Sequence, residues 1–122
     1  MRIPPLYHFT CRDHGLPGIR KRMTLKPQPS PFTCTPVVWL TSDPDATWEQ
    51  LGLTSTILDC DRMDVRCTVE TTRHCLSWAA YALKRGLPVG AREVLETGRE
   101  TDSWWVSERP LRVAALAELS DA

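Results

Sequence analysis

The sequence predicts a small α+β domain with a mixed or antiparallel sheet of five to six strands and two to four short helices. Short apolar or alternating segments, typical of strands, occur along the whole chain. Segments with helical spacing lie between them, and Pro or Gly marks most junctions. A length of 122 residues suits one hydrophobic core, so residues 1–122 are predicted to form a single domain.

The N-terminal part predicts a strand, a turn and a helix. Leu6–Thr10 (LYHFT) alternates in polarity, as a strand does. The following segment places Leu16, Ile19 and Met23 on one side of a short helix. Residues 26–36 hold four prolines and predict an extended surface loop.

The next segment predicts a buried strand followed by a helix. Residues 36–41 (PVVWLT) are apolar without alternation, which favours a strand that is buried on both faces near the middle of the sheet. Ser42 or Asp43 is a suitable N-cap, Pro44 suits the first helical position and Gly52 suits the end. We therefore expect a helix of about two turns here.

Two strand candidates, Ser55–Leu58 and Val65–Glu70, flank an acidic turn. In the second, Val65, Cys67 and Val69 share one face and the polar residues share the other. One face of this strand is expected to be exposed to solvent.

The strongest helical pattern is RHCLSWAAYALKRG, with Thr71 or Thr72 as the cap and Gly86 as the end. Its predicted buried positions, at helical spacing, are Leu76, Ala79, Ala80 and Leu83. Residues 90–98 predict another helical turn or two, Trp104–Ser107 a strand, and Leu111–Leu116 a final strand or short helix.

Charge and segment length argue against several protein classes. Fifteen basic and fifteen acidic residues give a formal net charge of zero, which does not indicate nucleic acid or an anionic membrane as a partner. No apolar segment approaches the roughly 20 residues that span a bilayer, and no signal peptide is recognisable. The five cysteines form no even disulfide framework. A soluble cytoplasmic protein with free thiols is expected.

No metal site is expected, although potential ligands are numerous. Structural zinc sites use ligands two to four residues apart, and the chain contains no CxxC. Cys11 with His8 or His14 would be the natural nucleophile and base, but only their nearness in sequence favours that pair. The chain also lacks GxSxG, P-loop and GxGxxG motifs. The metal candidates considered are Cys11, His14, Cys60, Cys67, His74 and Cys75.

A cleft around His8 is a different interpretation of the same residues. His8 and Thr10 end one strand, a second strand ends in Trp39-Leu-Thr41, and Trp48 lies on the helix that follows. Indole faces sandwich planar rings, while imidazole and hydroxyl groups bind polyols. This set suits a flat aromatic ligand that carries a sugar.

The segments LYHFT and PVVWLTSDPDATWEQ resemble the first two motifs of the ADP-ribosyltransferase fold in its histidine-tyrosine-glutamate branch. This branch includes diphtheria toxin and the poly(ADP-ribose) polymerases, and the fold also serves the tRNA 2'-phosphotransferases. The resemblance implies that NAD binds through His8 and Thr10, and that Trp39 and Trp48, where the family has tyrosines, wrap the nicotinamide with Thr41 or Ser42. The chain is also similar to small uncharacterised proteins of bacteria and their phages.

The third motif of that family is a glutamate on a late strand, which holds the ribose and stabilises positive charge as nicotinamide leaves. Ser103 aligns with that position, so the resemblance leaves Glu108 first and Asp102 second as the acidic group, with Glu100 a further candidate. Arg62, together with Arg66, is a candidate for holding a diphosphate. These residues imply transfer of ADP-ribose to a macromolecular acceptor.

The alternative function is a non-catalytic binding module, encoded by a phage or mobile element, that grips a host protein. Trp104 and Trp105 point to opposite faces of their strand, so one of them is expected in the core and the other exposed or covered by a loop. That indole and the proline-rich loop at 26–36 would form the contact surface.

Overall fold

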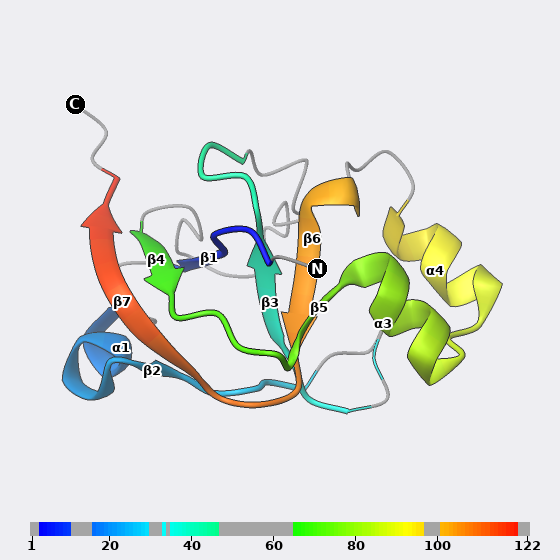
Figure 1. Cartoon of the computed structure of the whole chain (residues 1–122), viewed down its shortest axis with the longest axis horizontal. Helices are drawn as coiled ribbons and strands as arrows, with labels where there is room; N and C mark the ends of the chain where they lie inside the picture. Colours follow the sequence, from blue (N-terminus) through cyan, green and yellow to red (C-terminus); the bar gives the residue numbers. More distant parts are fainter. Residues whose placement is uncertain are drawn as a thin grey trace.

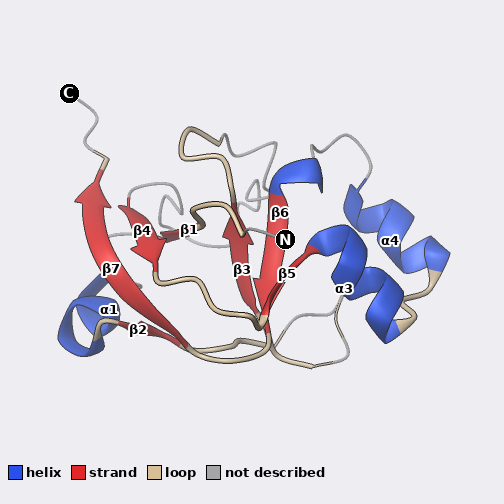
Figure 2. Cartoon of the chain, viewed as in Figure 1, coloured by secondary structure: helices blue, strands red, loops and turns tan. Residues whose placement is uncertain are grey.

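The computed structural model describes residues 3–10, 16–29, 33, 35–46, 65–96 and 101–119 (Figure 1). Seven strands in these ranges form one antiparallel sheet in the order β2-β7-β4-β1-β3-β6-β5 (Figure 2). The strands are β1 (Tyr7–Thr10), β2 (Thr24–Leu25), β3 (Val38–Thr41), β4 (Val65–Val69), β5 (Cys75–Ser77), β6 (Trp104–Ser107) and β7 (Leu111–Glu118). The helices are α1 (Leu16–Arg22), α3 (Trp78–Arg85), α4 (Val89–Glu96) and the 3-10 turn η1 (Thr101–Ser103).

The mixed α+β architecture confirms the predicted class, but the expected count of five to six strands is wrong. The structure has seven because β2 has two residues and β5 has three, and neither leaves an alternating pattern in the sequence. The final segment forms a strand, β7. The candidate strand Ser55–Leu58 lies outside the described residues.

The predicted burial of the central strands is confirmed. β3 lies between β1 and β6, away from both edges of the sheet, and Val38, Leu40 and Thr41 are buried. Val65, Cys67 and Val69 of β4 are buried and alternate with half-buried residues. These strands therefore carry the core, as their apolar patterns indicate.

Apolar side chains form a separate cluster on each face of the sheet, and a different helix covers each one. The α1 cluster comprises Leu16 and Ile19 of the helix with strand residues that include Leu40, Val65 and Cys67. The α3 cluster comprises Trp78, Tyr81, Ala82, Leu87, Trp104, Val106 and Val37. Helices α1 and α3 lie near opposite ends of the sheet in Figure 1.

The prediction for α3 is wrong about its start and its buried face. Residues 75–77 pair with β6 as a strand, so the helix begins at Trp78, and Ser77 caps it by accepting from the backbone N–H of Ala80 at 3.3 Å. The helix buries Trp78, Tyr81 and Ala82, whereas Ala79 and Ala80 are exposed and Leu83 is 83% exposed. The two aromatic rings bury more apolar area than the predicted face does, and they set the rotation of the helix.

Two other local predictions have mixed outcomes. Gly86 ends α3 in the left-handed conformation, at φ 61°, as predicted. Pro44 and Asp45 form a turn rather than the start of a helix, with the backbone N–H of Asp45 donating to Asp43 Oδ1 at 2.9 Å. From residue 47 that predicted helix lies outside the described residues.

The proline-rich segment 26–36 includes backbone pairing between Gln28 and Val37, with N···O distances of 3.0 and 3.1 Å. This pairing ties the described start of the segment to the residue before β3. Within the ranges that the structure describes, no helix has the length and apolar character needed to cross a membrane.

Candidate functional site

His8 lies on β1 beside β3, and its ring is fixed by a backbone carbonyl. Its Nδ1 is 2.8 Å from the carbonyl oxygen of Trp39. Because that oxygen only accepts, Nδ1 carries the proton, and Nε2 of the neutral ring is an acceptor. Burial lowers the pKa of His8, and the bond to Trp39 opposes this shift. His8 is therefore neutral and oriented.

The structure does not bring the side chains of His8 and Trp39 into one cleft. His8 is opposite Cys67 of β4, which belongs to the α1 cluster. Trp39 is opposite Val106 of β6, which belongs to the α3 cluster. Because directly paired residues share a face, the imidazole and the indole lie on opposite faces of the sheet.

The Trp39 ring is part of an aromatic group rather than the wall of an open cleft. Its centroid lies 5.2 Å from that of Trp78 and 5.8 Å from that of Trp104. Such edge-on and tilted contacts are typical of packed aromatic cores. Packing thus accounts for Trp39 without a ligand.

Other predicted site residues meet where β3 ends and β6 begins. Thr41 is buried, and its hydroxyl accepts from the backbone N–H of Asp43 at 3.1 Å. The backbone N–H of Ser42 donates to the carbonyl of Ser103 at 2.9 Å. Asp102 lies in η1 and is exposed, directly before Ser103. This contact joins the segment of the second motif to the position that aligns with the third.

His8 lies close to this end of the central strands, whereas Thr10 does not. Tyr7 is opposite Thr41, so His8 is one residue away from that pair. Thr10 shares the face of His8 but is at the other end of β1, opposite Val65. His8 therefore lies at the same end of the central strands as Ser42 and Asp102, whereas the Thr41 side chain, like that of Trp39, lies on the face opposite to His8.

Glu108 lies at the opposite end of β6 from Asp102. Four strand residues separate the two, a span of about 13 Å. The Glu108 carboxylate accepts from the Arg85 guanidinium and from the Thr35 hydroxyl. These bonds, with Arg85 the larger cause, hold the pKa of Glu108 below its usual value. Of the two predicted acidic residues, Asp102 thus lies at the end of β6 that is nearer to His8 along the sheet.

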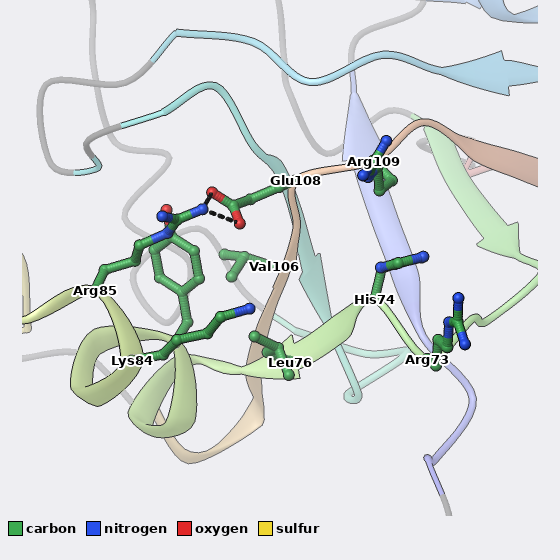
Figure 3. Close-up of a pocket in the computed structure, with 9 residues that line it drawn as sticks. Arg73, His74, Leu76, Lys84, Arg85, Val106, Glu108 and Arg109 are labelled. Carbon is green, nitrogen blue, oxygen red and sulfur yellow. Dashed lines mark hydrogen bonds and ion pairs between the residues drawn. The ribbon is translucent and has the colours of Figure 1, made fainter.

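Glu108 lies in a pocket that no local pattern in the sequence predicts. The pocket gathers basic side chains from α3, from the residues before β5 and from those after β6 (Figure 3). The pairs Arg73-His74 and Lys84-Arg85 are visible in the sequence. Only the pairing of β5 with β6 shows that they face a common space.

Several remaining candidates have little support or lie outside the described residues. Trp48 and Arg62 lie outside. Trp104 is buried and Trp105 is half-buried against the α1 cluster, so neither is the exposed indole of the binding-module interpretation. Arg66 donates to the carbonyl of Pro44 at 3.0 Å and lies 5.7 Å from the centroid of the Tyr7 ring.

Cys67 and Cys75 are buried free thiols, and burial raises the pKa of Cys67 to about 11. Among the residues that the structure describes, no three Cys, His, Asp or Glu side chains come together in a way that would hold a metal ion. Cys11, His14 and Cys60 lie outside those ranges.

No protein-family model matches this chain, and searches of curated proteins and of solved structures find no match either.

Proposed function

We propose that this chain binds NAD or a related nucleotide at the end of the central strands that carries His8 on β1, Ser42 after β3 and Asp102 before β6. The observation that supports this most is the position of His8 beside β3, with Nδ1 committed to the Trp39 carbonyl. A half-buried histidine held in one orientation presents Nε2 as a defined acceptor. A ribose hydroxyl or the carboxamide N–H of nicotinamide would donate to it.

The hydroxyl-bearing end of β3 supplies the second part of the proposed site. Ser42 is half-buried, and its backbone is anchored to Ser103. An anchored turn positions a hydroxyl group with little entropy to lose on binding. Trp39 is excluded from the proposed nicotinamide contact because its ring packs in the α3 cluster.

Transfer of ADP-ribose is the reaction that the resemblance implies, and Asp102 is the acidic residue proposed for it. In that reaction the bond between ribose C1' and the nicotinamide nitrogen breaks, and the electron pair leaves with nicotinamide. A nucleophile of the acceptor then bonds to C1' and loses its proton to water. A carboxylate beside the ribose stabilises the positive charge that develops. Asp102 flanks the His8 end of β6, whereas Glu108 is engaged with Arg85 at the other end.

Calorimetry with NAD tests the proposed binding. Wild type is expected to release heat at millimolar NAD or below, and His8→Ala is expected to weaken binding by about tenfold or more, as loss of one good hydrogen bond implies. His74→Ala is the matched control, since His74 is exposed and lies in the pocket around Glu108. Absence of heat from wild type rejects the proposal. If only the His74 variant loses NAD binding, the nucleotide binds in the pocket around Glu108 instead.

Nicotinamide release tests the catalytic part separately. With an added lysate as the source of acceptor, Asp102→Asn is expected to lower the rate by about 100-fold, the usual effect of removing an electrostatic stabiliser. Glu108→Gln is expected to leave the rate within about twofold. If Glu108→Gln lowers the rate of nicotinamide release and Asp102→Asn does not, Glu108 is the acidic residue of the reaction.

A further inference from the structure

A basic pocket of about 370 Å³ lies between α3 and the ends of β5 and β6. In Figure 3, Lys84 and Arg85 reach it from α3 on one side, while Arg73, His74 and Arg109 lie on the other. Leu76, Val106 and Tyr81 supply its apolar lining. The volume is at the lower end of the range for small-molecule sites.

The charge of this pocket contrasts with that of the whole chain. Four cationic side chains and a single carboxylate, that of Glu108, line the pocket. The cationic residues are Arg73, Lys84, Arg85 and Arg109. With His74 neutral, its formal charge is +3, although the chain as a whole has a formal net charge of zero. Positive charge is therefore concentrated at one concave place on a neutral protein, which favours an anion there.

Backbone pairing places two of these arginines, Arg73 and Arg109, beyond the same end of the β5–β6 pair. Cys75 of β5 is opposite Ser107 of β6, and Arg73 and Arg109 are each two positions beyond that pair. The side chains of both arginines lack hydrogen bonds and ion pairs within the described part of the chain. Both side chains are exposed, so their N–H donors are available to an anion that enters the pocket.

Both turns that carry these arginines are fixed by hydroxyl groups. The Ser107 hydroxyl, which is fully buried, donates to the carbonyl of Arg109 at 2.8 Å and accepts from its N–H at 3.1 Å. On the other turn, the Thr72 hydroxyl accepts from the N–H of His74 at 3.2 Å. The backbone positions of Arg73 and Arg109 are thus set before any ligand arrives.

The Glu108 carboxylate holds Arg85 in position and offsets one of the four positive charges of the pocket. Arg85 donates to the Glu108 carboxylate from one terminal nitrogen, Nη2, and Thr35 holds the same carboxylate from the other side. Arg85 also interacts with the Tyr81 hydroxyl, so it forms a fixed positive wall of the pocket. The tyrosine hydroxyl of Tyr81 lies 3.4 Å from that of Thr35 and completes this wall.

We propose that this pocket is a second binding site, for a small phosphate-bearing anion with at least two negative charges. Arg73 and Arg109 bind its oxygens, Lys84 adds charge, and Arg85 is a wall held in place by Glu108. Planar arginine forks match phosphate oxygens better than they match a generic anionic surface. The site is separate from the one proposed around His8, since it lies at the opposite end of β6.

Calorimetry with sodium pyrophosphate at low ionic strength tests this site in the full chain. Wild type is expected to bind, and Arg73→Gln and Arg109→Gln are each expected to weaken binding by about tenfold. The control is Arg20→Gln, an exposed arginine on α1 near the other end of the sheet, which should bind as wild type does (Figure 1). Thermal unfolding of each variant shows that it is folded, and Lys84→Gln provides a second probe on a different element.

Titrations with other anions distinguish a phosphate ligand from a diphosphate and from unspecific attraction of negative charge. Inorganic phosphate that binds as tightly as pyrophosphate identifies a single phosphate group as the ligand, whereas tighter pyrophosphate binding identifies a diphosphate. Citrate of equal or higher affinity shows unspecific attraction of polyanions and overturns the proposal. Absence of heat from wild type, or equal loss of affinity in Arg20→Gln, also overturns it.

Discussion

His8 lies on a strand, as predicted, but it does not share a cleft with the Trp39 side chain. Its strand pairs with β3, and its imidazole contacts the Trp39 carbonyl. The indole of Trp39 nevertheless faces the other side of the sheet. A sequence shows which residues alternate, but the register that decides which residues of two strands share a face depends on the whole sheet.

The stability of the protein is expected to fall at acidic pH because of His8. Its pKa in the folded state is lowered below that of an unfolded histidine, about 6.5. Below that pH the unfolded chain takes up a proton that the folded chain refuses, so the free energy of unfolding decreases until the lowered pKa is reached. Between pH 6.5 and 5.5 the decrease from this residue is at most about 1.4 kcal/mol.

Urea unfolding at several pH values measures this effect. His8→Gln is expected to flatten the dependence between pH 7 and 5.5 relative to wild type. A His8→Gln variant with an unchanged slope would show that another group causes the pH dependence.

At the scale of elements, α3 illustrates how strand pairing shifts a helix. The sequence from Arg73 to Gly86 has helical spacing throughout, but Cys75–Ser77 instead completes the sheet beside β6. The helix then begins on Ser77 and buries Trp78 and Tyr81. The C-terminal end was predictable because it depends on one local feature, a glycine in the left-handed conformation. The N-terminal end was not, because it depends on a distant strand.

Two glycine substitutions separate backbone conformation from packing at the α3–α4 junction. Gly86 has φ 61°, and an added Cβ would meet no atom within 4 Å, so Gly86→Ala tests conformation alone. Its expected cost is about 1 kcal/mol, since alanine disfavours the left-handed region. Gly90 also has no atom near an added Cβ but is helical, so Gly90→Ala should stabilise by a few tenths to about 1 kcal/mol. Chemical denaturation measures the change in the free energy of unfolding for both variants. Changes of the same sign in the two variants would contradict this account.

For the whole molecule, the sequence patterns indicated the fold class, and the candidate sites depended on how the sheet is assembled. Apolar alternation in Val65–Val69 and the run at Val37–Leu40 led to the correct central strands. The basic pocket was not recognised because its cations come from positions 73–74, 84–85 and 109, which only the β5–β6 pairing and α3 bring together. Non-local pairing of this kind leaves no local pattern in a sequence.

The two apolar clusters share strands, so we expect them to unfold together. β3 contributes Leu40 to the α1 cluster and Trp39 to the α3 cluster, and β6 contributes to both in the same way. Loss of one cluster exposes the back of the same strands and removes support from the other. A single cooperative transition is therefore expected, as is usual for domains of this size.

Two probes follow the two faces independently during denaturation. Alkylation of Cys67, resolved by mass spectrometry of its peptide, reports on the α1 cluster, where this thiol is fully buried. Tryptophan fluorescence, measured in a Trp105→Phe background that removes the indole packed against the α1 cluster, follows the grouped rings of Trp39, Trp78 and Trp104 on the α3 side. Val65→Ala in one cluster and Val106→Ala in the other each remove buried methyl groups at a cost of about 2 kcal/mol. Each variant should shift the denaturation midpoints of both probes equally, because the strands that join the clusters unfold as one unit. A variant that shifts only the midpoint of the probe on its own face would show that the two layers are separately stable.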